Sequence, residues 1–207
     1  MATIDANAFW NSFKQELPLK NYHKSVVSKC LTRNMHFFLG NLAKSYSLTA
    51  LFSSDNEKKT NMADKASKQK EFLLDGIIYE KGIIDSGDFV RNILVGIEWQ
   101  WDWGKSNDLL LWDFTKLLHV KMNLGVLLFY IHTKNAEEWQ LKFLDAQRIV
   151  SSQLALVIPS FTQLLLIGIK IEKVNKIWPL NAEARVFADK SWINLPNCQM
   201  SLTEYQG

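Results

Sequence analysis

The feature that most constrains this chain is an alternation, between residues 71 and 175, of short apolar runs with segments of helical periodicity. The runs are rich in aliphatic and β-branched residues, as buried strands are: EFLLDGIIY (71–79), NILVGIEWQW (92–101), LGVLLFYIHT (124–133) and QLLLIGIKIEKV (163–174). Between them, residues 108–122 and 136–155 space their apolar side chains as helices do. Strand–helix–strand units favour a sheet covered by helices on both faces. We therefore predict an α/β fold with a central mixed β-sheet flanked by helices.

The local signals predict how these elements follow one another. Residues 81–89 (KGIIDSGDF) supply turn residues between the first two runs, so these runs are expected to form a hairpin. The first fifty residues read as two helices, one ended by Pro18 and one from about residue 22 to residue 51 with a break or bend at Gly40. In the helix at 136–155, the expected core contacts are Trp139, Phe143, Leu144 and Ile149.

Length and composition favour one domain that folds around a single core. The chain has 207 residues, of which 47% are hydrophobic, and a net charge of only +3. We divide it into a helical N-terminal part (1–52), a catalytic core (71–175) and a C-terminal extension (176–207). Cys30 and Cys198 have no metal-binding spacing and are expected to be free thiols. No signal peptide or uninterrupted membrane-length segment is visible, so we expect a cytoplasmic protein with no membrane partner.

Two acids stand out because they occur in segments that otherwise read as core. Asp75 interrupts the run FLLDGII, and Glu98 ends the apolar run that precedes Gln100. A carboxylate in an apolar strand is costly unless it is paired, hydrogen-bonded or bound to a metal. Pairing of the two strands would bring Asp75 close to Glu98, and Gln100 would share a face with Glu98. Carboxylate and carbonyl oxygens form the type of site that Mg²⁺ prefers. The alternative is that both acids lie at strand edges and pair with lysines.

The segment that carries these residues resembles the restriction-endonuclease-like superfamily, the PD-(D/E)xK nucleases. The resemblance covers residues 71–132 and includes EFLLDGIIYEKG, NILVGIEWQW and LLLWDFTKLLHVKMNLGVLLFYI. It implies a restriction-endonuclease-like core in which Asp75 is the first acid and Glu98 the acid of the second motif. It further implies a metal-dependent DNA endonuclease that uses Mg²⁺, with Mn²⁺ as a substitute, and that forms a homodimer to cut both strands. Gln100 departs from the pattern, since it stands where most members have Lys.

The neutral Gln100 leaves three interpretations of the site open. In the first, Lys116 on the following helix supplies the missing positive charge, and Asp113 lies three residues away on the same helical face. An ordinary exposed or rim ion pair that contributes little is the alternative use of Asp113 and Lys116. In the second, the metal carries the whole electrostatic load. In the third, catalysis has been lost and only binding remains.

Other acids are weaker candidates for the same roles. Asp85 and Asp88 are nearer to Glu98 in sequence than Asp75, but the neighbouring Gly and Ser residues explain them as turn residues. Glu16 on the first predicted helix is an accessory candidate for binding metal or water. A solvated helix surface is its commoner use.

Basic and aromatic residues near the acids suggest where a polynucleotide would lie. Five lysines precede the strand of Asp75 and are placed to contact phosphates without reading bases: Lys58, Lys59, Lys65, Lys68 and Lys70. Trp101 and Trp103 offer base stacking, although packing against the next helix is the more ordinary use. We interpret His119 as structural. The favoured hypothesis is a Mg²⁺-dependent DNA endonuclease, with RNA in place of DNA as the alternative substrate. Its rivals are an inactive nucleic-acid-binding protein with the same fold and a structural subunit of a larger assembly.

Overall fold

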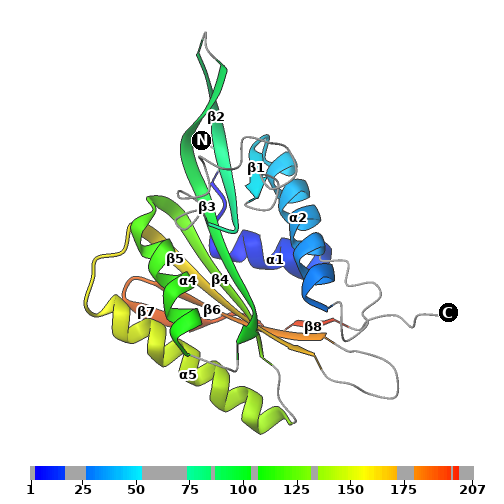
Figure 1. Cartoon of the computed structure of the whole chain (residues 1–207), viewed down its shortest axis with the longest axis vertical. Coiled ribbons are helices and arrows are strands. Elements are labelled where there is room, and N and C mark those ends of the chain that lie inside the picture. The colour runs from blue at the N-terminus through cyan, green and yellow to red at the C-terminus, as the bar shows by residue number, and fades with distance from the viewer. Residues whose placement is uncertain are drawn as a thin grey trace, which may run out of the picture.

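An eight-stranded mixed β-sheet with helices on both faces forms the framework of the protein (Figure 1). The computed structural model describes residues 3–16, 27–52, 74–84, 87–103, 107–131, 135–171, 180–196 and 198–200. The helices are α1 (Ala6–Glu16), α2 (Val27–Ser45), α4 (Asn107–His119) and α5 (Ala136–Leu154). The strands are β1 (Thr49–Phe52), β2 (Gly76–Ile84), β3 (Gly87–Trp103), β4 (Met122–Ile131), β5 (Phe161–Ile171), β6 (Leu180–Ala188), β7 (Ser191–Asn194) and β8 (Cys198–Met200). The predicted α/β class with a central mixed sheet is confirmed.

The sheet is antiparallel at its sides and parallel in its centre. Its strand order is β1-β2-β3-β4-β5-β6-β7, and β8 pairs with the far end of β6. Strands β3, β4 and β5 run parallel. After β3 and after β4, the helices α4 and α5 return the chain to the end of the sheet at which the next strand begins. The connections within β1-β2-β3 and β5-β6-β7 reverse the chain direction instead. The C-terminal segment is therefore part of the sheet, since β6 pairs with β5 from Leu180 to Phe187.

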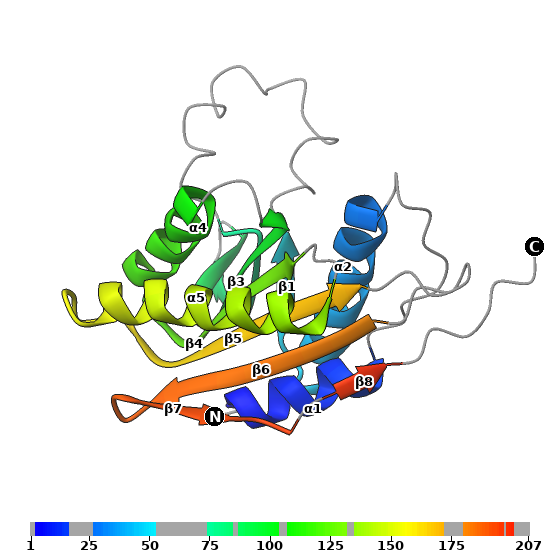
Figure 2. The same cartoon turned by 90° about the horizontal axis from the view of Figure 1, so that it is seen from below.

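Two hydrophobic cores lie on opposite faces of this sheet. Figure 2 shows the helices on the two sides of the sheet that cover them. One core contains buried residues of α1 and α2, and the other contains buried residues of α4 and α5. Successive residues of β4 contribute to the two cores in turn. Val126 and Leu128 face the first core, and Leu127 and Phe129 face the second. Such double coverage explains why the central strands read as continuous apolar runs.

The two N-terminal helices pack through aromatic side chains. Phe9 and Phe13 of α1 each meet Phe38 of α2 edge to face, with ring centroids 5.2 and 5.6 Å apart. The expected break at Gly40 is wrong, because α2 continues through it to Ser45. A glycine inside a helix costs only about 1 kcal/mol, and burial of the neighbouring Phe38, Leu39 and Leu42 outweighs that cost.

Several expected element bounds differ from the structure. Residues 49–52, expected at the end of a helix, form β1 because they pair with residues 76–79 of β2. The expected turn segment 81–89 lies mostly within strands, so the hairpin is longer than predicted. Leu144 is 44% exposed, whereas Ala146 and Val150 are buried. Ala146 and Val150 follow Trp139 and Phe143 at helical spacing, so the four residues share the buried side of α5. Leu144 lies on its outer side.

Replacing glycine by alanine is expected to have opposite effects on stability at Gly168 and at Gly40. A Cβ at Gly168 would lie 2.7 Å from Cε2 of the buried Phe143 ring and 3.2 Å from Trp139, whereas a Cβ at Gly40 would meet nothing within 4 Å. We expect Gly168→Ala to lower the free energy of unfolding by about 1–3 kcal/mol through overpacking. Gly40→Ala should raise it by about 0.5–1 kcal/mol, because alanine has the higher helix propensity. Urea denaturation of the two variants measures both. Equal effects would contradict the packing described at Gly168.

Candidate functional site

Asp75 and Glu98 meet where β2 begins beside β3. Asp75 directly precedes Gly76, which pairs with Ile97 of β3. The backbone N–H of Asp75 donates a hydrogen bond to Glu98 Oε1 at 3.2 Å, and the backbone N–H of Trp99 donates to Asp75 Oδ2 at 2.9 Å. The carboxyl group of each acid is thus bonded to the other segment. This reciprocal pair fixes both side chains at one end of the β2–β3 pairing.

The alternation of β3 decides which residues share the site. Trp99 packs in the core beneath α1 and α2, where its ring lies 5.7 Å from that of His36. Glu98 therefore points to the opposite face, which α4 covers, and it is completely buried. Gln100 is two residues further along the same strand and is partly exposed. Because Glu98 and Gln100 are two positions apart in β3, they lie on the same face of the strand, as the sequence predicted.

Helix α4 brings a positive charge to Glu98. The Lys116 Nζ atom lies 2.5 Å from Glu98 Oε2 and 3.0 Å from Asp113 Oδ1. The side chains of Lys116 and Asp113 are only 14% and 11% exposed, so the i,i+3 pair is not the exposed ion pair considered from the sequence. Lys116 thus bridges two carboxylates, of which one comes from the sheet and one from its own helix.

Burial makes both acids hard to ionise, and the negative charge of Asp75 adds to this effect on Glu98. Desolvation, followed by the negative charge of Asp75, raises the pKa of Glu98 to about 9, against the lowering effect of Lys116. Desolvation likewise raises the pKa of Asp75, although the Trp99 N–H and Lys116 act in the opposite direction. Burial by itself would lower the pKa of Lys116, but its hydrogen bond to Glu98 and the nearby carboxylates raise it. The cluster has more carboxyl groups than cations and therefore favours the uptake of further positive charge.

The available oxygen atoms limit how a cation could be held. Within the described residues, no hydrogen bond engages Asp75 Oδ1, while both oxygens of Glu98 accept bonds from within the chain. No three His, Cys, Asp or Glu side chains of the described segments are grouped as a metal site. Asp75 and Glu98 would thus supply two oxygen ligands. Mg²⁺ commonly binds through one or two carboxylates and retains several waters.

The remaining sequence candidates are distributed elsewhere. His119 is exposed at the end of α4. The five lysines Lys58, Lys59, Lys65, Lys68 and Lys70 lie outside the described residues, as does Asp85. The backbones of Glu16, Asp88, Trp101 and Trp103 lie in α1 and β3, but their side chains are outside the described part.

Two contributors to the site were not assigned a role there from the sequence. Asp113 was recognised only as a helical neighbour of Lys116, and its i,i+3 spacing was the available signal. The backbone N–H of Trp99 has no sequence signal, because any residue at that position would supply it.

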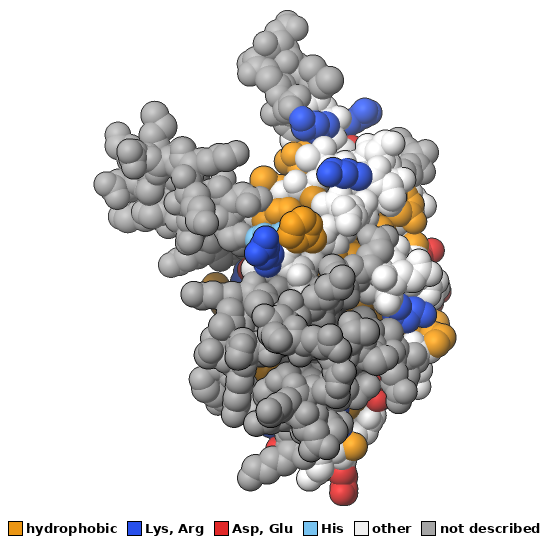
Figure 3. All heavy atoms as spheres, turned by 90° about the vertical axis from the view of Figure 1, so that its right-hand side faces the viewer, with side chains coloured by type: hydrophobic (Ala, Val, Ile, Leu, Met, Phe, Trp, Pro, Cys, Tyr) orange, Lys and Arg blue, Asp and Glu red, His pale blue; other side chains and the backbone are white. Residues whose placement is uncertain are grey.

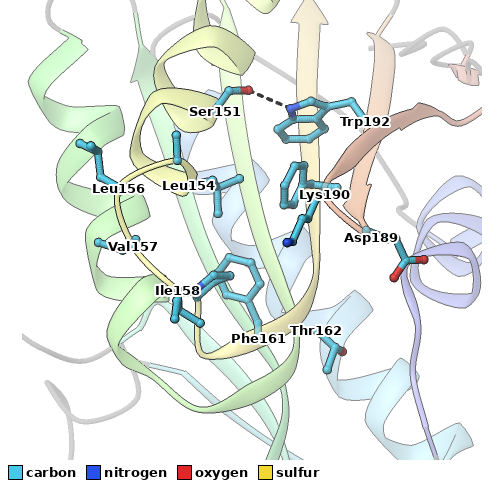
Figure 4. Close-up of a pocket in the computed structure, with 14 residues that line it drawn as sticks. Ser151, Leu154, Leu156, Val157, Ile158, Phe161, Thr162, Asp189, Lys190 and Trp192 are labelled. Carbon is cyan, nitrogen blue, oxygen red and sulfur yellow. Dashed lines mark hydrogen bonds between the residues drawn. The ribbon is translucent and has the colours of Figure 1, made fainter.

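A separate apolar pocket of about 890 Å³ lies between the end of α5, the loop to β5 and the β6–β7 turn (Figure 4). Leu154, Phe161 and Trp192 are turned toward its interior, and Trp192 Nε1 donates a hydrogen bond to Ser151 Oγ at 2.8 Å. Asp189, the single acid among its lining residues, is exposed and turned away. The pocket therefore lacks the paired carboxylates that distinguish the Asp75–Glu98 cluster.

Comparison with known proteins identified no relative. No protein-family model, curated protein or solved structure matches the chain. Among the described helices, none is sufficiently long and apolar to cross a membrane.

The raised pKa of Glu98 predicts how stability depends on pH. Since the folded protein holds its proton more tightly than the unfolded chain does, the free energy of unfolding should fall as the pH rises from about 4.5 to about 9. Asp75 contributes with the same sign. We expect Glu98→Gln, which is neutral throughout, to flatten this dependence when unfolding is measured with urea across that range.

The matched control for this prediction is Glu137→Gln. Glu137 is an exposed acid in the first turn of α5, so its substitution should leave the slope of stability against pH unchanged. Wild-type stability that stays constant or rises between these pH values would contradict the proposed burial of Glu98.

Proposed function

We propose that this protein is a metal-dependent phosphodiester hydrolase, most specifically a DNA endonuclease of the restriction-enzyme type. The observation that carries the proposal is the contact between Asp75 and Glu98, with Lys116 Nζ 2.5 Å from Glu98. Two carboxylates and a lysine at one point are the groups that metal-assisted phosphate hydrolysis uses.

The order of elements supports the same reaction class. In the resembled nucleases, an acid on one strand and an acid on its neighbour precede a helix and a further strand. Here Asp75 stands at the start of β2 and Glu98 in the antiparallel β3, and α4 then leads into the parallel β4. The order of these elements and the adjacency of the two strands therefore support the proposal.

The chemistry of the acids suits Mg²⁺, or Mn²⁺ in its place. Both are oxygen ligands, and a divalent cation would relieve the repulsion that raises the pKa of Glu98. A bound Mg²⁺ supplies an acidified water and neutralises charge that develops on the phosphate. Asp75 and Glu98 would hold the ion, and the backbone N–H of Trp99 would keep Asp75 oriented toward it.

Lys116 would replace the cation that Gln100 cannot supply. Its ammonium is next to Glu98, and Asp113 holds it there from the preceding turn of α4. The partly exposed Gln100 lies on the same face and would position water or phosphate by hydrogen bonds. The five lysines at positions 58–70 would contact backbone phosphates, and a homodimer would cut both strands of a duplex.

Gln100 also favours a second function. A chain that keeps this fold and its acid pair without the motif lysine would serve as an inactive nucleic-acid-binding protein or assembly subunit. Lys116 then stabilises the buried Glu98 without taking part in a reaction.

Cleavage of plasmid DNA in Mg²⁺ or Mn²⁺ tests the proposal. We expect Asp75→Asn and Glu98→Gln each to lower the cleavage rate by at least about 100-fold, because each removes a charged metal ligand. Lys116→Met should lower it to a similar extent, and Lys116→Arg should recover part of the rate because it restores the positive charge.

The matched control is Asp145→Asn, which removes a partly exposed acid of α5 paired with Arg148. It should cleave as the wild type does. Cleavage that survives both Asp75→Asn and Glu98→Gln would contradict the site assignment. DNA binding without cleavage by the folded wild type in either metal would favour the inactive alternative.

A further inference from the structure

The outer face of α2 carries a line of exposed residues that the hydrophobic core does not use. Arg33, Phe37, Asn41 and Lys44 recur every three or four residues and so share one side of the helix. All four are exposed, and Phe37 remains 57% exposed. The opposite side of α2 is buried through Met35, Phe38, Leu39, Leu42 and Ala43. We call the exposed line the α2 face.

The sequence segment that contains the α2 face carries charged residues of a single sign. Residues 17–54 contain five Lys or Arg residues and no Asp or Glu. The whole chain carries 24 basic and 21 acidic residues, so this segment departs strongly from the average balance. Figure 3 shows the side of the molecule that α2 occupies, where a basic side chain lies beside a histidine and a protruding hydrophobic side chain. An uninterrupted positive segment of this kind attracts a polyanion.

Contacts within the α2 face leave its charges available. The Arg33 guanidinium lies over the Phe37 ring at 5.9 Å, a cation–π contact that orients the arginine without neutralising it. Neither Arg33 nor Lys44 forms an ion pair with a described residue. The exposed Phe37 thus has an identifiable role as a support for Arg33.

Helix α2 packs against the neighbours of the two acids, Gly76 and Trp99, on the face of the sheet opposite to the Glu98 side chain. Its Leu39 side chain lies 3.2 Å from the position that a Cβ of Gly76 would occupy, and Gly76 directly follows Asp75. The His36 ring lies 5.7 Å from the ring of Trp99, which follows Glu98. A ligand bound along α2 would therefore lie on the helical layer that packs against β2 and β3 from the face opposite to Glu98 and Lys116.

We propose that the α2 face binds the phosphate backbone of duplex DNA, with Arg33 and Lys44 contacting separate phosphates and Phe37 positioning Arg33. Lys44 lies eleven residues after Arg33, which corresponds to roughly 16 Å of helix and is long enough to contact more than one phosphate of a duplex. Contacts of this kind give affinity without base recognition. The inference rests on the proposed function, since it assigns a substrate-binding surface to the same nuclease.

The test measures the salt dependence of binding to a short fluorescent DNA duplex in EDTA, where no metal-dependent cleavage occurs. Each phosphate contact contributes about 0.9 to the slope of log K against log salt concentration. We expect Arg33→Gln and Lys44→Gln each to reduce that slope by about 1, and the double variant by about 2. Phe37→Leu should weaken binding severalfold with a smaller change in slope, because the charge of Arg33 remains.

The matched control is Arg148→Gln, which removes an arginine that is 81% exposed on α5, in the other helical layer. It should bind DNA as the wild type does. An unchanged slope in the folded Arg33→Gln and Lys44→Gln variants would overturn the inference, as would a wild type that does not bind the duplex. Binding to anionic phospholipid vesicles instead of DNA, lost in the same variants, would overturn it in favour of a membrane-surface role.

Cleavage assays separate failure of this inference from failure of the proposed function. If plasmid cleavage depends on Asp75 and Glu98 while Arg33→Gln and Lys44→Gln keep the wild-type salt slope, the nuclease proposal stands and the α2 face is not its DNA-binding surface. If the slopes fall as expected but no metal supports cleavage, the α2 face binds DNA in a protein without nuclease activity.

Discussion

The burial of the Glu98 carboxyl group is the constraint on which the rest of the site depends. A charge removed from water is costly unless groups around it compensate. Here the compensation comes from Lys116 on α4 and from a backbone N–H at the start of β2. These two partners come from opposite sides of Glu98 in the sequence, so the carboxyl group links the hairpin to the crossover helix. Its neighbour Asp75 adds a second negative charge, which makes the cluster receptive to a cation.

Positive charge is distributed in the molecule in two distinct ways. Lys116 is held tightly between carboxyl groups and is mostly withdrawn from solvent. Arg33 and Lys44, in contrast, are exposed on a helix without acidic residues. The first arrangement is suited to local electrostatics at a reacting phosphate, and the second to holding a long polyanion. The structure thus separates the groups proposed for chemistry from those proposed for attachment, since they belong to helical layers on opposite faces of the sheet.

The acid pair was predictable because each acid interrupts an apolar pattern, and the pairing of Asp75 with Glu98 follows once two adjacent runs form a hairpin. The mixed sheet was likewise predictable from strand–helix–strand order. Features that depend on tertiary contacts were not. Residues 49–52 become a strand only because β2 offers an edge, and α2 continues through Gly40 because its apolar side is buried. The place of Leu144 on the outer side of α5 depends on which residues of that helix face β4 and β5. The α2 face was not predicted from the sequence. Its basic residues are spread over a long stretch, whereas the lysines at 58–70 are clustered.

The alternation of β3 from Val95 to Trp99 has a consequence for how this protein can change over evolutionary time. Trp99 and Glu98 belong to opposite layers, and their neighbours in β4 alternate in the same way. Inserting or deleting one residue ahead of Glu98 would exchange the two layers, sending the indole toward α4 and the carboxylate into an aromatic interior. Point substitutions along this strand are therefore tolerated far more readily than changes in its length, and we expect lineages descended from this protein to accumulate their insertions in loops and to keep the residue count of β3.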